Sequence, residues 1–179
     1  MTAANLVTLI RVLLVPAIVF ALIEGFYGWA FVLFLVAGLS DAVDGAIARL
    51  FDQQSDLGVI LDPVADKLLL VSVFVMLGLL EAVPTWLVLA VVSRDLVIVA
   101  GVLITHMIGR PMSVRPAFVS KVNTVAQIAL AALVLLSLAI EGDWPVAIGA
   151  LVWLTAALTL ASLMLYTWQW TRHVGTETI

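Results

Sequence analysis

Long apolar runs alternate with short polar or turn-forming breaks along the whole chain. Each run is close to the length of about 20 residues at which an α-helix crosses the hydrocarbon core of a bilayer. The breaks are rich in acidic residues, glycine or proline, which are typical of turns. This pattern predicts six helices, near Leu6–Ile23, Trp29–Arg49, Val59–Leu80, Thr85–His106, Val122–Ile140 and Val146–Trp168.

The composition places these helices in a membrane. Of the 179 residues, 64% are hydrophobic and 11% are charged, and the mean hydropathy is +1.23. A typical soluble domain is about 45–50% apolar and about 25% charged. A soluble chain of this length would still expose roughly a third of its surface. We therefore predict one all-α integral membrane domain that spans residues 1–179.

The charges are distributed unevenly over the predicted breaks. Basic residues lie at or beside the second and fourth breaks and near the C-terminus: Arg49, Lys67, Arg110, Arg115, Lys121 and Arg172. The other three breaks carry acidic residues and neither Lys nor Arg. Because cytoplasmic loops are enriched in Lys and Arg, we expect both termini to be cytoplasmic. The basic residues never form a run, which argues against a nucleic-acid partner.

Four aspartates lie at the predicted cytoplasmic ends of the second and third helices. Asp41 and Asp44 are three residues apart, and Asp62 and Asp66 are four apart. Each pair therefore shares one helix face. Carboxylates in or near hydrocarbon need a partner, and close carboxylates raise each other's pKa unless a cation neutralises them. An all-oxygen set suits Mg²⁺ or Mn²⁺.

The residues between the aspartates favour a phosphorylated ligand. Gly45, Ala48 and Gly58 are small and let a ligand approach the main chain, although Gly45 and Gly58 could instead permit close helix packing. Arg49 supplies a cation of the kind that binds phosphate with two hydrogen bonds. Carboxylates, divalent ions and such an arginine together indicate phosphoryl transfer.

The whole pattern resembles the signature of the CDP-alcohol phosphotransferases. It reads Asp41-(x)2-Asp44-Gly45-(x)2-Ala48-Arg49-(x)8-Gly58-(x)3-Asp62-(x)3-Asp66. The resemblance implies a homodimer with a cytoplasm-facing cavity, in which an alcohol attacks a CDP-linked lipid and CMP leaves. It also implies two divalent ions, with the first three aspartates as ligands and Asp66 as both ligand and base.

The resemblance also implies a nucleotide site. Gly45, Ala48, Arg49 and Gly58 would hold the CDP moiety. Asn5 and Thr8 resemble the family's N-terminal Asn-(x)2-Thr element and would touch the nucleotide. The alternative for this second pair is a helix cap and a buried hydroxyl.

Further cations favour an anionic acceptor alcohol. Arg94 lies about 14 Å along a helix from Thr85, deep in the membrane, where a charge is by default a functional hypothesis. The alternative is an ion pair that braces two helices. Asp95 points about 100° away from Arg94, so we expect the two to have different partners. Arg94, Arg110, Arg115 and Lys121 would bind the acceptor's phosphate. Arg110 and Arg115 could instead be ordinary cytoplasmic loop charges.

Within the family, several segments are similar to CMP-forming, eukaryotic-type cardiolipin synthases. These are Ser93-Arg94-Asp95, Arg115 to Thr124, and Gln127. Phosphatidylglycerophosphate synthases more often have Arg-Glu at the first segment and a second Lys in place of Asn123. The resemblance therefore implies transfer from CDP-diacylglycerol to phosphatidylglycerol, with Arg94, Arg110, Arg115, Lys121 and Asn123 at the acceptor site. Glycerol 3-phosphate is the alternative acceptor.

A divalent-cation transporter is a further alternative, because it would also place carboxylates in the membrane. Such proteins usually have inverted repeats and broken helices near the midplane. The aspartates of this chain lie at helix ends and are accompanied by Arg49, which disfavours that alternative. The absence of an N-terminal targeting extension leads us to expect a bacterial inner membrane.

Overall fold

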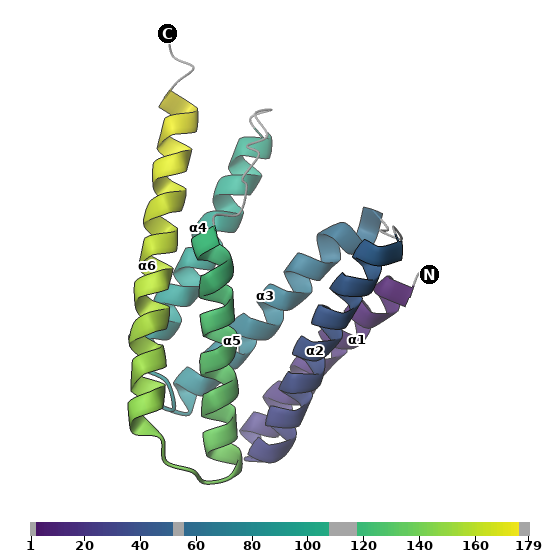
Figure 1. Ribbon diagram of the computed structural model, residues 1–179, viewed down its shortest axis with the longest axis vertical. Coiled ribbons are helices and arrows are strands. Elements are labelled where there is room, and N and C mark those ends of the chain that lie inside the picture. Colours follow the sequence, from purple (N-terminus) through teal and green to yellow (C-terminus); the bar gives the residue numbers. More distant parts are fainter. Residues whose placement is uncertain (1–2, 52–55, 108–117, 176–179) are drawn as a thin grey trace. The chain divides into compact units, whose positions relative to one another are not determined.

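The computed structural model is entirely helical in the part of the chain that it describes (Figure 1). It describes residues 3–51, 56–107 and 118–175, with side chains over 12–40, 67–101 and 118–170. The described residues form six helices: α1 (Ala3–Ile23), α2 (Tyr27–Phe51), α3 (Asp56–Leu79), α4 (Thr85–Met107), α5 (Phe118–Ala139) and α6 (Pro145–Gly175). The all-α class and the six helices predicted from the sequence are thus confirmed.

Each helix extends at one end or both beyond the bounds expected from hydropathy, and the extension is largest in α5 and α6. Helix α5 begins at Phe118 rather than at Val122, so Ser120 lies inside its first turn. Helix α6 continues past Trp168 to Gly175. Both extensions contain polar residues, which are compatible with helical backbone although they end a hydropathy run.

Three of the inter-helix turns share one local structure, in which a residue with positive φ lies two positions after the end of the helix. The residues are Gly25 (φ 75°), Glu81 (φ 56°) and Glu141 (φ 52°). After the first helix, Phe26 N donates to Ala21 O at 2.8 Å. The equivalent bonds in the other turns run from Ala82 N to Leu77 O and from Gly142 N to Ser137 O, at 3.0 and 2.9 Å. These bonds satisfy carbonyls that a helix end would otherwise leave open.

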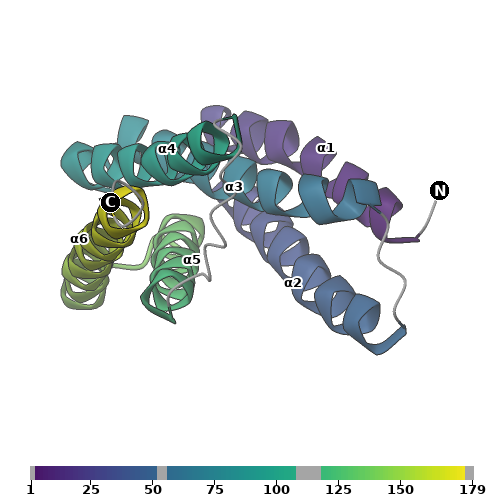
Figure 2. The same ribbon diagram turned by 90° about the horizontal axis from the view of Figure 1, so that it is seen from above.

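One compact unit of the chain covers residues 1–82 and 131–144. In it, α1 packs along both α2 and α3 (Figure 2). The buried side chains recur at helical spacing, which brings one apolar face of each helix into the core. They are Ile18, Ala21 and Leu22 of α1, Ala30, Phe34 and Ala37 of α2, Leu69, Leu70, Val73, Phe74 and Leu77 of α3, and Ala131, Val134 and Leu135 of α5.

The other unit covers residues 83–130 and 145–179, and in it α4 packs along α6. Part of its core is apolar, with Leu87 and Val91 of α4 and Leu130 of α5 among the fully buried side chains. The rings of Trp86 and Trp153 lie 5.6 Å apart between their centroids. Unlike the described core of the first unit, this one also contains polar and charged side chains.

The surface of both units is consistent with a membrane protein. Large apolar side chains are exposed on all six helices, with Leu79, Trp153 and Val146 exposed to 72%, 70% and 85%. In the described part of the chain, Phe118–Ala139 and Pro145–Trp170 are long and apolar enough to cross a bilayer. Six crossings and cytoplasmic termini remain predictions.

Candidate active site

The four motif aspartates lie on two continuous helices of the first unit. Asp41 and Asp44 belong to α2, and Asp62 and Asp66 belong to α3. Because both segments are helical, intervals of three and four residues bring each pair to one side of its helix. Each of these helices packs against α1. The chemistry of this donor set, four carboxylates on two helices, fits a hard divalent ion.

The side chains of the motif lie outside the residues that the structure describes at side-chain level. This holds for the four aspartates and for the predicted nucleotide residues Gly45, Ala48, Arg49, Gly58, Asn5 and Thr8. Arg110 and Arg115 lie outside the described residues altogether. Their roles as metal, nucleotide or acceptor ligands therefore stay predictions, with only the helical backbone of the motif established.

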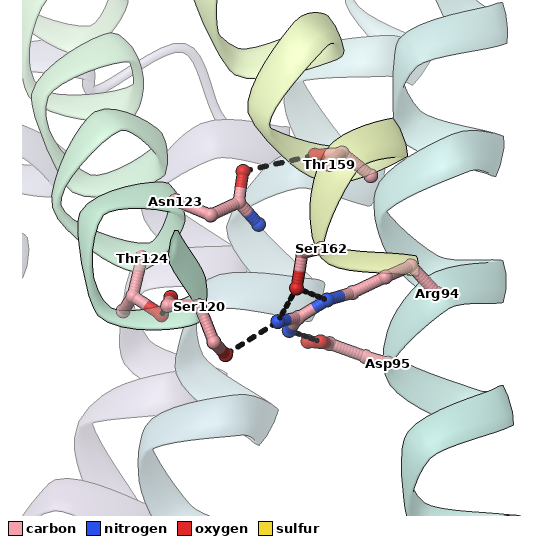
Figure 3. Close-up of polar contacts among 7 residues, drawn as sticks. All are labelled: Arg94, Asp95, Ser120, Asn123, Thr124, Thr159 and Ser162. Carbon is pink, nitrogen blue, oxygen red and sulfur yellow. Dashed lines mark hydrogen bonds and ion pairs between the residues drawn. The ribbon is translucent and has the colours of Figure 1, made fainter. Parts of the chain in front are cut away.

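Arg94 is the centre of a polar cluster in the second unit (Figure 3). Its side chain is only 4% exposed. Nη2 donates to Ser120 Oγ of α5 at 2.5 Å and to Ser162 Oγ of α6 at 2.6 Å. Nε donates to the same Ser162 oxygen at 3.2 Å. One guanidinium from α4 thus connects all three helices of this unit.

The expectation that Arg94 and Asp95 have different partners is wrong. Arg94 Nη1 lies 2.6 Å from Asp95 Oδ1, and both side chains are largely buried. The two Cβ atoms do point in different directions, but the arginine side chain is long enough to fold back over its neighbour. The alternative, in which Arg94 forms an ion pair between two helices, is also wrong. The ion pair lies within α4, and serine hydroxyls make the contacts to α5 and α6.

This ion pair neutralises the charge of the cluster. The positive charge of Arg94 is compensated at hydrogen-bond distance by the carboxylate of Asp95. A buried charge without such a partner costs several kcal/mol. Because each serine oxygen accepts a bond from the guanidinium, each hydroxyl proton can still be donated elsewhere.

One helical turn further along α5, Asn123 continues the cluster. It is completely buried, and its Oδ1 accepts a hydrogen bond of 3.0 Å from Thr159 Oγ1 of α6 (Figure 3). Its Nδ2 has no partner among the described residues, nor do Gln127 Nε2 and Thr155 Oγ1. Leaving a buried polar atom unpaired costs about 1–3 kcal/mol.

The structure therefore brings together two of the five predicted acceptor residues. Arg94 and Asn123 belong to one cluster, since Ser120 and Asn123 lie one turn apart on α5 and Thr159 and Ser162 lie one turn apart on α6. Lys121 is exposed on α5 and is not part of this cluster.

Sequence reasoning missed the hydroxyl face of α6. Thr155, Thr159 and Ser162 are all buried and are spaced by four and three residues, which places them on one helix face. In an apolar run such a row of hydroxyls is a usable signal, because hydroxyls often hydrogen-bond between helices in membranes. The spacing alone would still not have identified Arg94 and Asn123 as their partners.

The chain is helical where the structure describes it and carries pairs of carboxylate residues on two consecutive helices. The family model for CDP-alcohol phosphatidyltransferase matches residues 1–168. The chain therefore belongs to the CDP-alcohol phosphatidyltransferase family.

Several proteins of known sequence are similar to this chain. A Mycobacterium tuberculosis protein is 40% identical over 104 residues, which are 58% of this chain and 49% of that protein. The human cardiolipin synthase (CMP-forming) is 33% identical over 147 residues, 73% of this chain and 49% of its own length. The cardiolipin synthase (CMP-forming) of Streptomyces coelicolor is 33% identical over 114 residues, 59% of this chain and 53% of its own. The match thus spans about half the length of these relatives.

Proposed function

We propose that this chain transfers a phosphatidyl group from CDP-diacylglycerol to the hydroxyl of phosphatidylglycerol, with cardiolipin and CMP as products. The observation that carries the proposal is the aspartate motif on helical segments of α2 and α3, in a chain that the family model matches over residues 1–168. Relatives named cardiolipin synthase (CMP-forming) support the choice of acceptor.

The proposed reaction is a direct displacement at phosphorus. The oxygen of the acceptor hydroxyl forms a bond to the phosphorus that carries diacylglycerol, and the bond from that phosphorus to the CMP oxygen breaks. Asp66 takes the hydroxyl proton, for which its carboxylate must come within hydrogen-bond distance of the acceptor and be ionised. CMP leaves with the electron pair of the broken bond.

Metal dependence is part of the proposal. Asp41, Asp44, Asp62 and Asp66 would hold two divalent ions, Mg²⁺ or Mn²⁺, because these ions prefer oxygen ligands. When bound, such ions neutralise charge on the pyrophosphate and on the leaving group. Gly45, Ala48, Arg49 and Gly58 would position the CDP moiety, with Asn5 and Thr8 beside the nucleotide.

The acceptor side of the proposal rests on the second unit. Lys121, Arg110 and Arg115 would attract the phosphate of the acceptor, and Arg94 and Asn123 of the polar cluster would lie on the acceptor side of the site. Glycerol 3-phosphate is the second candidate acceptor, because the segment from Leu61 to Lys67 resembles phosphatidylglycerophosphate synthases as well as cardiolipin synthases.

We further propose a multi-pass protein of a bacterial inner membrane that works as a homodimer with its active site towards the cytoplasm. The exposed apolar side chains and the charge asymmetry of the breaks support the membrane topology. A site enclosed by helices would exclude water and so limit hydrolysis of the CDP-linked lipid.

Product analysis by mass spectrometry tests this function. The purified protein receives CDP-diacylglycerol and Mg²⁺ or Mn²⁺, with either phosphatidylglycerol or glycerol 3-phosphate. We expect cardiolipin and CMP from the first mixture, and neither product when a chelator removes the metal. Phosphatidylglycerophosphate from the second mixture alone would replace the acceptor and leave the chemistry standing. CMP from neither mixture would overturn the proposed activity.

A further inference from the structure

Helices α5 and α6 face each other in a fixed antiparallel register. Ser120 of α5 and Ser162 of α6 hydrogen-bond the same nitrogen, Arg94 Nη2. Three residues further along α5, Asn123 accepts a bond from Thr159, which lies three residues back along α6. A step of three residues forwards along α5 therefore corresponds to a step of three residues backwards along α6, from the pair Ser120 and Ser162 to the pair Asn123 and Thr159.

The same register predicts one further pair. Four residues beyond Asn123 is Gln127, and four residues before Thr159 is Thr155. Gln127 is 2% exposed and Thr155 is fully buried. Neither Gln127 Nε2 nor Thr155 Oγ1 has a hydrogen-bond partner in the described part of the chain, and Asn123 Nδ2 one turn away has none either.

Three unpaired polar atoms at adjacent positions of one seam are unusual, because most buried polar groups in proteins are hydrogen-bonded. Two of these atoms are amide nitrogens, which only donate, and the third is a hydroxyl, which donates or accepts. An oxygen that accepts from both amides and donates its own proton to Thr155 Oγ1 would satisfy all three. An ammonium group accepts nothing and is excluded, whereas a hydroxyl oxygen has lone pairs for the two amides and can either donate to or accept from Thr155 Oγ1.

The charge of the seam favours a neutral ligand. Arg94 is the only cation in the described cluster, and Asp95 compensates it at 2.6 Å. Asn123, Gln127 and Thr155 themselves are uncharged. A second anion buried beside them would carry a desolvation cost that no further cation of the cluster offsets.

We propose that Asn123, Gln127 and Thr155 form a binding site for one neutral hydroxyl oxygen in the seam between α5 and α6. A water molecule meets the requirement, since buried waters typically make about three hydrogen bonds to otherwise unpaired groups. A hydroxyl of the acceptor's glycerol headgroup has the same chemistry. Only this second source rests on the proposed function; the site itself does not.

Nuclear magnetic resonance of the side-chain amides tests the site. The full-length protein, labelled with ¹⁵N, is placed in nanodiscs of phosphatidylcholine. The sequence contains two Asn and four Gln, so a Gln127→Met variant and an Asn123→Leu variant suffice to assign the two signals. We expect cross-peaks between water protons and the NH₂ groups of both residues.

A lipid titration separates the two sources. Phosphatidylglycerol is added in one series and phosphatidylethanol, which lacks the headgroup hydroxyls, in the other. Water cross-peaks that are present without added lipid identify water as the source. Amide shifts with phosphatidylglycerol alone identify the headgroup hydroxyl. If neither water cross-peaks nor selective shifts occur, the proposal is overturned. Because no turnover is measured, this result is independent of whether the enzyme makes cardiolipin.

A pair of matched variants tests the part played by Thr155. Thr155→Val removes the hydroxyl from the seam and should abolish the water cross-peaks or the selective shifts. Thr167→Val makes the same chemical change on the same helix, but its exposed hydroxyl donates to Leu163 O and Met164 O of its own helix at 3.0 Å. It should change nothing. Unaltered signals in a folded Thr155→Val protein would contradict the proposed site.

Discussion

The two units of this protein bury different chemistry. In the unit of residues 1–82 and 131–144, every buried side chain that the structure describes is apolar. In the unit of residues 83–130 and 145–179, the described core also contains seven polar or charged residues: Arg94, Asp95, Asn123, Gln127, Thr155, Thr159 and Ser162. The core of the first unit is therefore stabilised by apolar packing, and that of the second unit by hydrogen bonds as well.

The difference has a physical meaning in a membrane. Lipid tails are as apolar as leucine, so apolar helices gain little from the hydrophobic effect when they associate. Small side chains such as Ala21, Ala30 and Ala37 let the helices of the first unit approach closely. The hydrogen bonds of the second unit specify instead which residues face each other, because a shift of one residue would break each of them.

The comparison also separates the two proposed halves of the reaction. The aspartate motif lies on α2 and α3 of the apolar unit, whereas Arg94 and Asn123 belong to the polar unit. Substitutions in the first motif should therefore change chemistry with little effect on packing. Substitutions in the second cluster should change folding and acceptor binding together.

The largest effect is expected at the aspartates. Asp66→Asn should lower turnover about 10³-fold, because an amide cannot take the acceptor's proton, while CDP-diacylglycerol still binds. Asp62→Asn should lose both turnover and binding, because holding the metal is the sole role proposed for Asp62, whereas Asp66 is also the base. Steady-state kinetics and calorimetry with CDP-diacylglycerol measure the two quantities. Near-normal turnover of Asp66→Asn would remove its assignment as the base.

Arg94 should have the next largest effect, this time on stability. Arg94→Met leaves Asp95 largely buried without the 2.6 Å ion pair and removes the donor to Ser120 and Ser162. Breaking a buried pair in this way should lower the free energy of unfolding by about 3 kcal/mol. Denaturant titration in mixed micelles measures it.

Lys121→Met is the matched control for Arg94, because Lys121 is a cation on the exposed side of α5. It should leave stability unchanged and, if Lys121 binds the acceptor's phosphate, raise KM for phosphatidylglycerol. A raised KM with unchanged stability in Arg94→Met would instead mean that its guanidinium serves the acceptor and not the packing of helices.

Two glycines compare the packing of the units directly. A Cβ on Gly101 would lie 3.1 Å from both Cε1 and Cζ of Tyr166 and closer still to its hydroxyl, which donates to Ile98 O at 3.2 Å. Gly101→Ala should therefore lower stability by about 1–2 kcal/mol. A Cβ on Gly38 of α2 meets nothing within 4 Å.

Gly38→Ala should accordingly raise stability by about 0.5–1 kcal/mol, through the lower entropy of the unfolded chain. Both variants are compared in the same thermal or denaturant titration. Equal effects of the two substitutions would show that α4 and α6 do not depend on the close approach at Gly101.

An effect about as small as that of Gly38→Ala is expected at a turn. Glu141 has a φ of 52°, which places its Cβ in an unfavourable position. Glu141→Gly should raise the melting temperature, with a gain of about 1 kcal/mol. Glu141→Ala keeps the Cβ and provides the control. A gain in the alanine variant as well would mean that the charge, rather than the backbone, limits the stability of this turn.

Much of the fold could be predicted because its signals are local. Apolar runs of membrane-spanning length located all six helices, and the breaks located the turns. The start of α5 could not be predicted in this way, because Ser120 and Lys121 end the apolar run. The helix continues through them since Ser120 Oγ accepts a bond from Arg94 and Thr124 Oγ1 donates to Ser120 O at 3.1 Å.

The candidate site also has a part that local spacing predicts and a part that depends on contacts between helices. Spacing within one helix determined that Asp41 and Asp44 share a face, as do Asp62 and Asp66, because the repeat of a helix is constant. The partners of Arg94 were decided only by the tertiary structure, since Ser120 and Ser162 are 26 and 68 residues away in the chain. Periodicity reports which face a residue occupies, but it contains no information on the register between helices. That register is set by packing and by hydrogen bonds between side chains that meet only after the helices have assembled.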